Sequence, residues 1–142
     1  MTKPLIFIAE DDPIYLKLIQ HHLEKTGNYH VVGFNNGEDC LAQMEENPDV
    51  IVLDYYLGSQ SEQGGMKGIE IIEKIEGNKN NTKVIILSGQ DKMDVAIDCI
   101  KKGAFDYIVK SESAFVKLDH IISMALYVKR MEISNPAALI GR

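Results

Sequence analysis

Long apolar runs, cysteines and an excess of positive charge are all missing or scarce in this sequence of 142 residues. No apolar run approaches the roughly 20 residues that a membrane-spanning helix needs. The two cysteines, Cys40 and Cys99, form neither a metal-binding nor a redox spacing and fit small core residues. The net charge of −6 argues against a general nucleic-acid surface. We therefore expect no membrane span and no direct nucleic-acid contact, and we expect a reducing cytoplasm.

The start of the chain also lacks the features of a secretory signal. Met1-Thr2-Lys3-Pro4 leads directly into a short apolar segment and not into the longer apolar region of a signal peptide. The composition is 45% hydrophobic and 25% charged, which is ordinary for a globular protein. At this length we expect one domain with a core of its own.

Short apolar segments alternate with stretches of helical periodicity along the chain. The apolar segments lie at residues 5–9, 29–34, 50–54, 83–87 and 105–109, and helical stretches follow at about 13–25, 38–46, 68–77, 91–102 and 113–132. This alternation is typical of right-handed crossovers that build a parallel sheet. We therefore predict an α/β fold with a doubly wound, five-stranded parallel sheet.

Two of the helical stretches carry apolar sets at helical spacing. The first set comprises Ile14, Leu18, Ile19 and Leu23, and the set in the fourth helix comprises Met93, Ala96, Ile97 and Ile100. We expect each set to form one apolar face of its helix. Asp91 precedes the fourth helix and can cap it.

Polar side chains stand at the ends of four of the five predicted strands. Glu10, Asp11 and Asp12 follow the first strand, Asp54 ends the third, Ser88 follows the fourth and Lys110 follows the fifth. Taken singly, each is an ordinary helix cap, turn residue or surface charge. Because the carboxyl ends of parallel strands share one edge of the sheet, we expect these side chains to converge there.

Carboxylates that meet in one crevice repel each other, and a divalent cation relieves the repulsion. Oxygen ligands without histidine or cysteine suit Mg²⁺. We expect Asp11 and Asp54 to bind it directly, Glu10 to act through a water molecule, and a backbone carbonyl just past Asp54 to add a ligand. Asp54 can then attack a phosphoryl group and form an acyl phosphate, while Lys110 and Ser88 bind the phosphoryl oxygens.

This pattern resembles the receiver domain of response regulators in two-component systems, over about residues 4–132. The resemblance rests on Glu10-Asp11, Asp54, Ser88 with Gly89, Gly103-Ala104, and Lys110 after the fifth strand. It implies a flavodoxin-like sheet with strand order 2-1-3-4-5. It also implies that Asp54 accepts a phosphoryl group from a phosphohistidine of a sensor histidine kinase or a histidine phosphotransfer protein.

The same resemblance implies roles for two tyrosines. The main-chain carbonyl of Tyr56 would be the remaining Mg²⁺ ligand. Tyr107 matches the family's rotating aromatic, which would swing inward as Ser88 moves toward the phosphoryl group. This would change the surface made by the fourth helix, the fifth strand and the last helix, and so signal to an output domain or a partner, as in transcription regulation. A homodimer through this surface is a further hypothesis.

Three features depart from the family pattern. The segment after Asp54 is longer by about six residues, and Gly58 stands near the place of a usual proline. Ser111 follows Lys110 where the family has proline. Tyr56 and Gln90 occupy positions that tune hydrolysis, and we expect Tyr56 to shield the acyl phosphate from water.

We assign residues 1–132 to the receiver domain and residues 133–142 to a tail or to the start of a linker to an output domain. Within the second segment, Leu139-Ile140-Gly141 resembles the beginning of the AAA+ ATPase domain of bacterial enhancer-binding activators. This resemblance favours the regulatory end of a longer transcription regulator, and a natural tail is the alternative.

Other function classes fit the residues less well. An aspartate-nucleophile phosphatase acting on outside substrates would need a second acid two residues after Asp54, where Tyr56 stands. A degenerate receiver that serves only as an interaction platform conflicts with the complete residue set. A flavodoxin-like cofactor module would need a glycine-rich turn after the first strand. We therefore expect no enzyme activity beyond self-phosphorylation and self-dephosphorylation.

Overall fold

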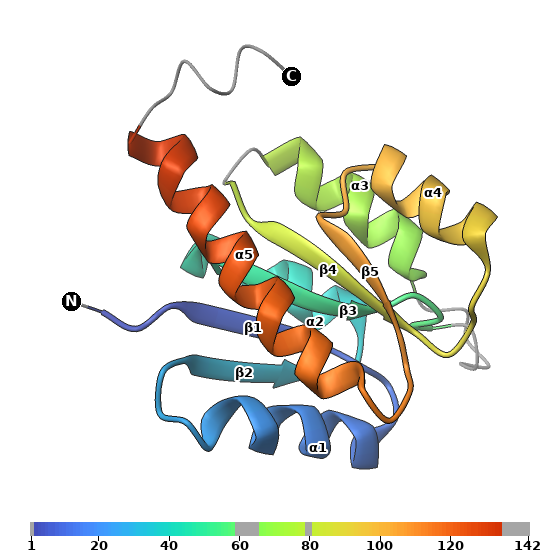
Figure 1. The fold of residues 1–142 in the computed structure, drawn as a ribbon. Coiled ribbons are helices and arrows are strands. Elements are labelled where there is room, and N and C mark those ends of the chain that lie inside the picture. The colour runs from blue at the N-terminus through green and yellow to red at the C-terminus, as the bar shows by residue number, and fades with distance from the viewer. Residues whose placement is uncertain (1, 59–65, 79–80, 135–142) are drawn as a thin grey trace.

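The computed structural model of the protein describes residues 2–58, 66–78 and 81–134 (Figure 1). The strands are β1 (Leu5–Ala9), β2 (His30–Phe34), β3 (Val50–Asp54), β4 (Lys83–Ser88) and β5 (Asp106–Val109). The helices are α1 (Pro13–Glu24), α2 (Gly37–Ala42), the 3₁₀ helix η1 (Met44–Glu46), α3 (Gly68–Asn78), α4 (Met93–Lys101) and α5 (Ala114–Ser134). The Leu139-Ile140-Gly141 segment lies outside the described residues.

The five strands form one parallel sheet in the order β2-β1-β3-β4-β5, which confirms the predicted fold and topology. Asp54 pairs with Leu87 in the sheet, and Ser88 pairs with Val109. The register therefore brings the last residues of β3, β4 and β5 to the same edge. The strand β2, which ends without a reactive side chain, lies at the outside of the sheet, as expected.

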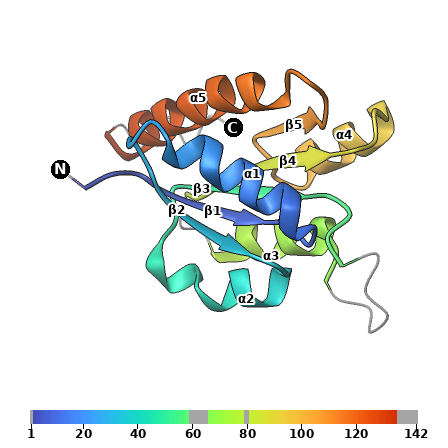
Figure 2. The same ribbon diagram turned by 90° about the horizontal axis from the view of Figure 1, so that it is seen from below.

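Helices cover both faces of the sheet, with α1 and α5 on one face and α2, α3 and α4 on the other (Figures 1 and 2). Side chains of β3 alternate between the two faces. Val50 and Val52 pack in the cluster under α1 and α5, whereas Ile51 and Leu53 pack in the cluster under α2, α3 and α4. Both faces of β3 are therefore buried, which explains its uninterrupted apolar sequence.

The cysteines behave as predicted, since Cys40 and Cys99 are both free and buried. Each packs in the cluster under α2, α3 and α4. Burial raises the pKa of the Cys40 thiol to about 12 and that of Cys99 to about 11, in the second case with help from Asp98. Both thiols therefore stay protonated and unreactive near neutral pH.

No helix in the described part of the chain is long and apolar enough to span a membrane.

The helix α1 begins as its sequence predicts but packs through a different face. Pro13 occupies the first turn, and the Asp12 side chain accepts hydrogen bonds from the backbone N–H groups of Ile14 and Tyr15. The buried residues are Leu16, Ile19 and Leu23, whereas Ile14 and Leu18 are 71% and 51% exposed. The prediction of one face was wrong for Ile14 and Leu18, because α1 carries two apolar stripes and only packing against the sheet selects between them.

The helix α4 lies over the sheet edge at β5 and buries little of its apolar face (Figure 1). Met93 is 77% exposed, and Ile97 and Ile100 are each 47% exposed. Because α4 lies at the edge of the sheet, no second layer among the described residues covers this apolar face.

The prediction that Asp91 caps α4 was wrong. The N-cap residue is Lys92, and its side chain forms no capping hydrogen bond.

The remaining differences concern helix ends. The predicted helix over residues 38–46 is divided, because α2 ends at Ala42 and the chain tightens into η1. Asn47 then adopts a left-handed conformation with φ of 56° before Pro48. The last helix continues to Ser134, slightly past its predicted end.

Candidate functional site

Asp54 is the last residue of β3, and its side chain lies at the carboxyl edge of the sheet with an exposed fraction of 7%. Its Oδ1 accepts a hydrogen bond of 3.2 Å from the backbone N–H of Tyr56, which fixes the carboxylate in an Asx turn. Gly68 packs against this turn and donates a backbone hydrogen bond of 3.2 Å to the Tyr55 carbonyl oxygen, and a Cβ there would lie only 2.8 Å from that oxygen. Only glycine lets α3 begin directly against the end of the strand.

Two further carboxylates come from the end of β1. Glu10 is only 2% exposed, and its Oε2 accepts a hydrogen bond of 3.2 Å from the backbone N–H of Asp12. Asp11 is exposed to solvent. Carboxylate oxygens of Glu10, Asp11 and Asp54 all lie within 4.8 Å of one another. The structure therefore brings together three of the four acidic residues that the sequence predicted to converge, whereas Asp12 caps α1 instead.

Burial and the closeness of these carboxylates raise the pKa values of Glu10 and Asp11. Burial raises the pKa of Glu10, and its hydrogen-bond and charge interactions with Asp54 raise it further. The pKa of Asp11 is raised by partial burial and then by the neighbouring Glu10. A pKa raised in this way means that the ionised form is less favourable in the folded protein than in a free side chain. An added cation would stabilise the ionised cluster, and three carboxylates form a donor set that fits a hard divalent cation.

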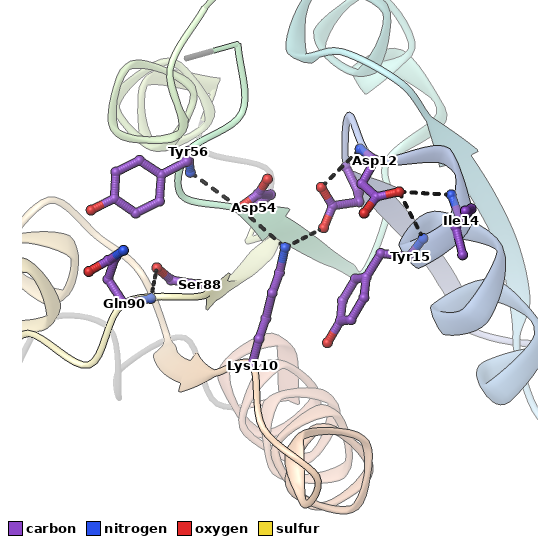
Figure 3. A network of polar contacts seen from close by, with 9 residues as sticks. Asp12, Ile14, Tyr15, Asp54, Tyr56, Ser88, Gln90 and Lys110 are labelled. Carbon is purple, nitrogen blue, oxygen red and sulfur yellow. Dashed lines mark hydrogen bonds and ion pairs between the residues drawn. The ribbon is translucent and has the colours of Figure 1, made fainter. Parts of the chain in front are cut away.

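Lys110 follows β5 and supplies the positive charge of the site (Figure 3). Its Nζ donates a hydrogen bond of 2.7 Å to Glu10 Oε1 and lies 3.8 Å from Asp54 Oδ1. Burial alone would lower the pKa of Lys110, but the Glu10 hydrogen bond and the charges of Asp54 and Glu10 outweigh this and raise it. The ammonium therefore stays protonated beside Asp54. The Lys110–Ser111 peptide bond is trans.

Ser88 ends β4 and is fully buried. Its Oγ accepts a hydrogen bond of 3.1 Å from the backbone N–H of Gln90 (Figure 3). The hydroxyl of Tyr107 donates a hydrogen bond of 2.6 Å to the backbone carbonyl of the same Gln90. The Gln90 backbone thus connects Ser88 and Tyr107, a link that the sequence did not reveal because it runs through main-chain atoms.

Tyr15 is the site residue that the sequence analysis missed. Its ring lies under the Lys110 ammonium, with 4.5 Å between Nζ and the ring centroid. Burial raises the pKa of the Tyr15 phenol, so the ring stays neutral. The sequence shows an aromatic residue in the first helical turn after the acidic segment. It does not determine in which direction the Tyr15 ring points, so the contact with Lys110 could not be predicted.

Comparison with known proteins identifies the family that this chain resembles. The family model of the response regulator receiver domain matches residues 6–122. The protein-glutamate methylesterase/protein-glutamine glutaminase of Clostridium acetobutylicum is 31% identical, and the match covers 98% of this chain and 41% of that protein. The transcriptional regulatory protein ZraR of Klebsiella oxytoca is 30% identical, with 96% of this chain and 30% of that protein covered.

Solved structures agree with the family match. A response regulator receiver domain protein from Clostridium thermocellum is 27% identical, with a TM-score of 0.78 and coverage of 90% of this chain and 98% of that one. The chain spans less than half the length of both curated relatives. Because the family model matches most of its residues, the chain belongs to the response regulator receiver domain family.

Proposed function

We propose that this receiver domain is a phosphorylation-controlled signalling switch whose phosphoryl acceptor is Asp54. The observation that carries the proposal is the position of the Lys110 ammonium, which is hydrogen-bonded to Glu10 and lies 3.8 Å from Asp54 Oδ1. A charge in this place can stabilise the phosphoryl oxygens of a group bound to Asp54. Asp54 is 7% exposed at the sheet edge, so only a small part of its surface is accessible to a donor.

The proposed reaction is a phosphoryl transfer from a phosphohistidine of a sensor histidine kinase or a histidine phosphotransfer protein. A carboxylate oxygen of Asp54 attacks phosphorus while the bond between phosphorus and the imidazole nitrogen breaks. The bonding electrons return to that nitrogen, and the product is an acyl phosphate on Asp54. Attack by water later releases inorganic phosphate and restores the carboxylate, so we propose no turnover of outside substrates.

Asp11, Asp54 and the main-chain carbonyl of Tyr56 would hold Mg²⁺, with Glu10 acting through a water molecule. When bound, the ion supplies positive charge that offsets the charge of the transferring group. Lys110 binds one phosphoryl oxygen, and the Ser88 hydroxyl donates a hydrogen bond to another. Tyr56 stands two residues after Asp54 in the turn, where its side chain would slow the access of water to the acyl phosphate.

Phosphorylation would be transmitted from the site to the surface by conformational changes of Ser88 and Tyr107. When the Ser88 hydroxyl turns to a phosphoryl oxygen, it no longer accepts the hydrogen bond from Gln90 N–H. The loop that carries the Gln90 carbonyl can then shift, and the Tyr107 hydroxyl loses its present acceptor. Rotation of Tyr107 would alter the surface formed by α4, β5 and α5.

This surface, which we call the α4-β5-α5 surface, suits a homodimer. Exposed apolar side chains occupy both helices beside β5: Met93, Ile97 and Ile100 on α4, and Met124, Tyr127 and Met131 on α5. Burying such residues against a second copy would remove apolar area from water. Sedimentation should show a dimer that strengthens on phosphorylation, and a monomer in both states would exclude this arrangement.

Support for a wider role comes from the relatives, which include a transcriptional regulatory protein. We propose that residues 1–132 form the receiver and that residues 133–142 lead to an output domain in a transcription regulator. The proposal places the protein in the cytoplasm and gives this domain no direct contact with nucleic acid, consistent with its net charge of −6. The enzyme activity in one relative's name is not assigned to this chain.

The test is incubation with Mg²⁺ and acetyl phosphate, followed by intact-protein mass spectrometry. The protein should gain one phosphoryl group, and Asp54→Asn should gain none, because an amide oxygen is a poor nucleophile. Asp94→Asn, which changes an exposed carboxylate on α4, is the matched control and should be phosphorylated normally. Full phosphorylation of Asp54→Asn, or no phosphorylation of the unaltered protein, would refute the assignment.

A further inference from the structure

The Lys110 ammonium has a third neighbour besides the two carboxylates. Its Nζ lies 4.5 Å from the centroid of the Tyr15 ring (Figure 3). The Lys110 side chain is 23% exposed, so the ammonium is partly removed from water. A cation over an aromatic face is attracted by the ring quadrupole, and this attraction grows as water is excluded.

The ring is held in place from two sides. The Asp12 cap fixes the backbone of the first turn of α1 through hydrogen bonds of 3.0 Å to Ile14 N–H and 3.4 Å to Tyr15 N–H. The Tyr15 ring then packs against Phe115 of α5, with 5.9 Å between centroids. Phe115 is in turn covered by the His22 ring at 5.0 Å. Tyr15 is therefore part of the contact between α1 and α5.

Lys110 takes a new partner if the proposed function holds. In the structure it donates to Glu10 at 2.7 Å, and binding a phosphoryl oxygen requires another of its three N–H groups to turn to the new group. Its side chain has four rotatable carbon–carbon bonds, so during this rearrangement the ammonium can also swing into water. The Tyr15 ring is uncharged, and its attraction for the ammonium does not depend on whether a metal ion neutralises the carboxylates.

We propose that Tyr15 is a positioning residue for Lys110. The ring face keeps the ammonium beside Asp54 while it adopts the phosphoryl group as a partner. This inference rests on the proposed function of Asp54 and Lys110 and extends it to a residue on α1. Tyr15 itself touches no reacting atom and acts only through Lys110.

The first test compares Tyr15→Leu with Tyr15→Phe in the initial rate of phosphorylation by acetyl phosphate. Loss of the aromatic face should slow phosphorylation by about three- to tenfold, which corresponds to a partly desolvated cation–π contact. Tyr15→Phe keeps the face and should restore most of the rate. Tyr29→Leu is the matched control, because Tyr29 is another half-buried tyrosine that packs on the same hydrophobic cluster.

A double-mutant cycle separates positioning from a general effect on the fold. In a Lys110→Ala background, Tyr15→Leu should cause no further loss of rate, because there is no ammonium left to position. Equal losses in both backgrounds would overturn the inference, as would equal rates for Tyr15→Leu and the unaltered protein. If the unaltered protein is not phosphorylated at all, the proposed function fails instead, and the two failures are thereby distinguished.

Nuclear magnetic resonance provides a readout that does not depend on activity or on a stable variant. Methylene protons of Lys110 next to Nζ should be shifted upfield by the ring current of Tyr15 in the unaltered protein. Tyr15→Phe should keep this shift, and Tyr15→Leu should remove it. Unshifted methylene signals in the unaltered protein would overturn the inference even if Tyr15→Leu cannot be purified in folded form.

Discussion

Replacing Lys110 with alanine is expected to slow phosphorylation of Asp54 by about 10²- to 10³-fold, the usual effect of removing one charge-stabilising donor from a reaction site. The reason is the placement of Nζ, which lies 2.7 Å from Glu10 and 3.8 Å from Asp54 at the end of β5. The measurement is the initial rate with acetyl phosphate at saturating Mg²⁺, followed by mass spectrometry.

The same substitution should have the opposite effect on metal binding. Without the ammonium, the charges of Glu10, Asp11 and Asp54 are less well compensated, so Mg²⁺ should bind more tightly in calorimetric titration. Lys117→Ala removes an exposed lysine of α5 and serves as the control for both measurements. Weaker metal binding in Lys110→Ala, or an unchanged rate of phosphorylation, would contradict the role given to Lys110.

Replacing Glu132 with alanine is expected to lower the free energy of unfolding by about 3 kcal/mol, the low end for a buried ion pair, because it leaves the partly buried ammonium of Lys83 without this partner. Lys83 Nζ donates hydrogen bonds to both carboxylate oxygens of Glu132, at 3.0 and 2.8 Å. Glu132 is 2% exposed and Lys83 is 15% exposed at the side chain. Such a loss is a large share of the stability of a small domain, and urea unfolding measures it.

The exposed pair of Lys102 and Glu73, with side chains 44% and 53% exposed, provides the matched control. Glu73→Ala should cost less than about 1 kcal/mol. The double substitution Lys83→Met with Glu132→Leu should recover most of the stability, since an apolar pair can replace a buried ion pair. A loss in Glu132→Ala no larger than that in Glu73→Ala would show that burial does not strengthen this pair.

The sequence predicted the sheet and the converging side chains because both follow from local patterns. Uninterrupted apolar runs, such as Val50 to Leu53, indicate strands covered on both faces, and parallel topology then brings Asp54, Ser88 and Lys110 to one edge. No knowledge of side-chain packing is needed for this step. The predicted ligand and acceptor roles of these residues remain for experiment to test.

Ion pairs between segments that are far apart in the chain could not be predicted from the sequence. Helical periodicity singles out neither Lys129 nor Glu132, yet Lys129 pairs with Asp49 at 2.7 Å and Glu132 pairs with Lys83. His22 on α1 likewise contacts Asp119 of α5, with 2.9 Å between Nε2 and Oδ1. In each case the partner lies far away in the chain, so helical periodicity carries no information about it.

The most direct test of the account is chemical identification of the phosphorylated residue. Borohydride reduces an acyl phosphate of aspartate to homoserine, which peptide sequencing by mass spectrometry can locate. After phosphorylation with acetyl phosphate and Mg²⁺, homoserine should appear at position 54 and should be absent when the donor is omitted. Reduction products at Asp11 or at any other carboxylate, with aspartate unchanged at position 54, would contradict the central claim.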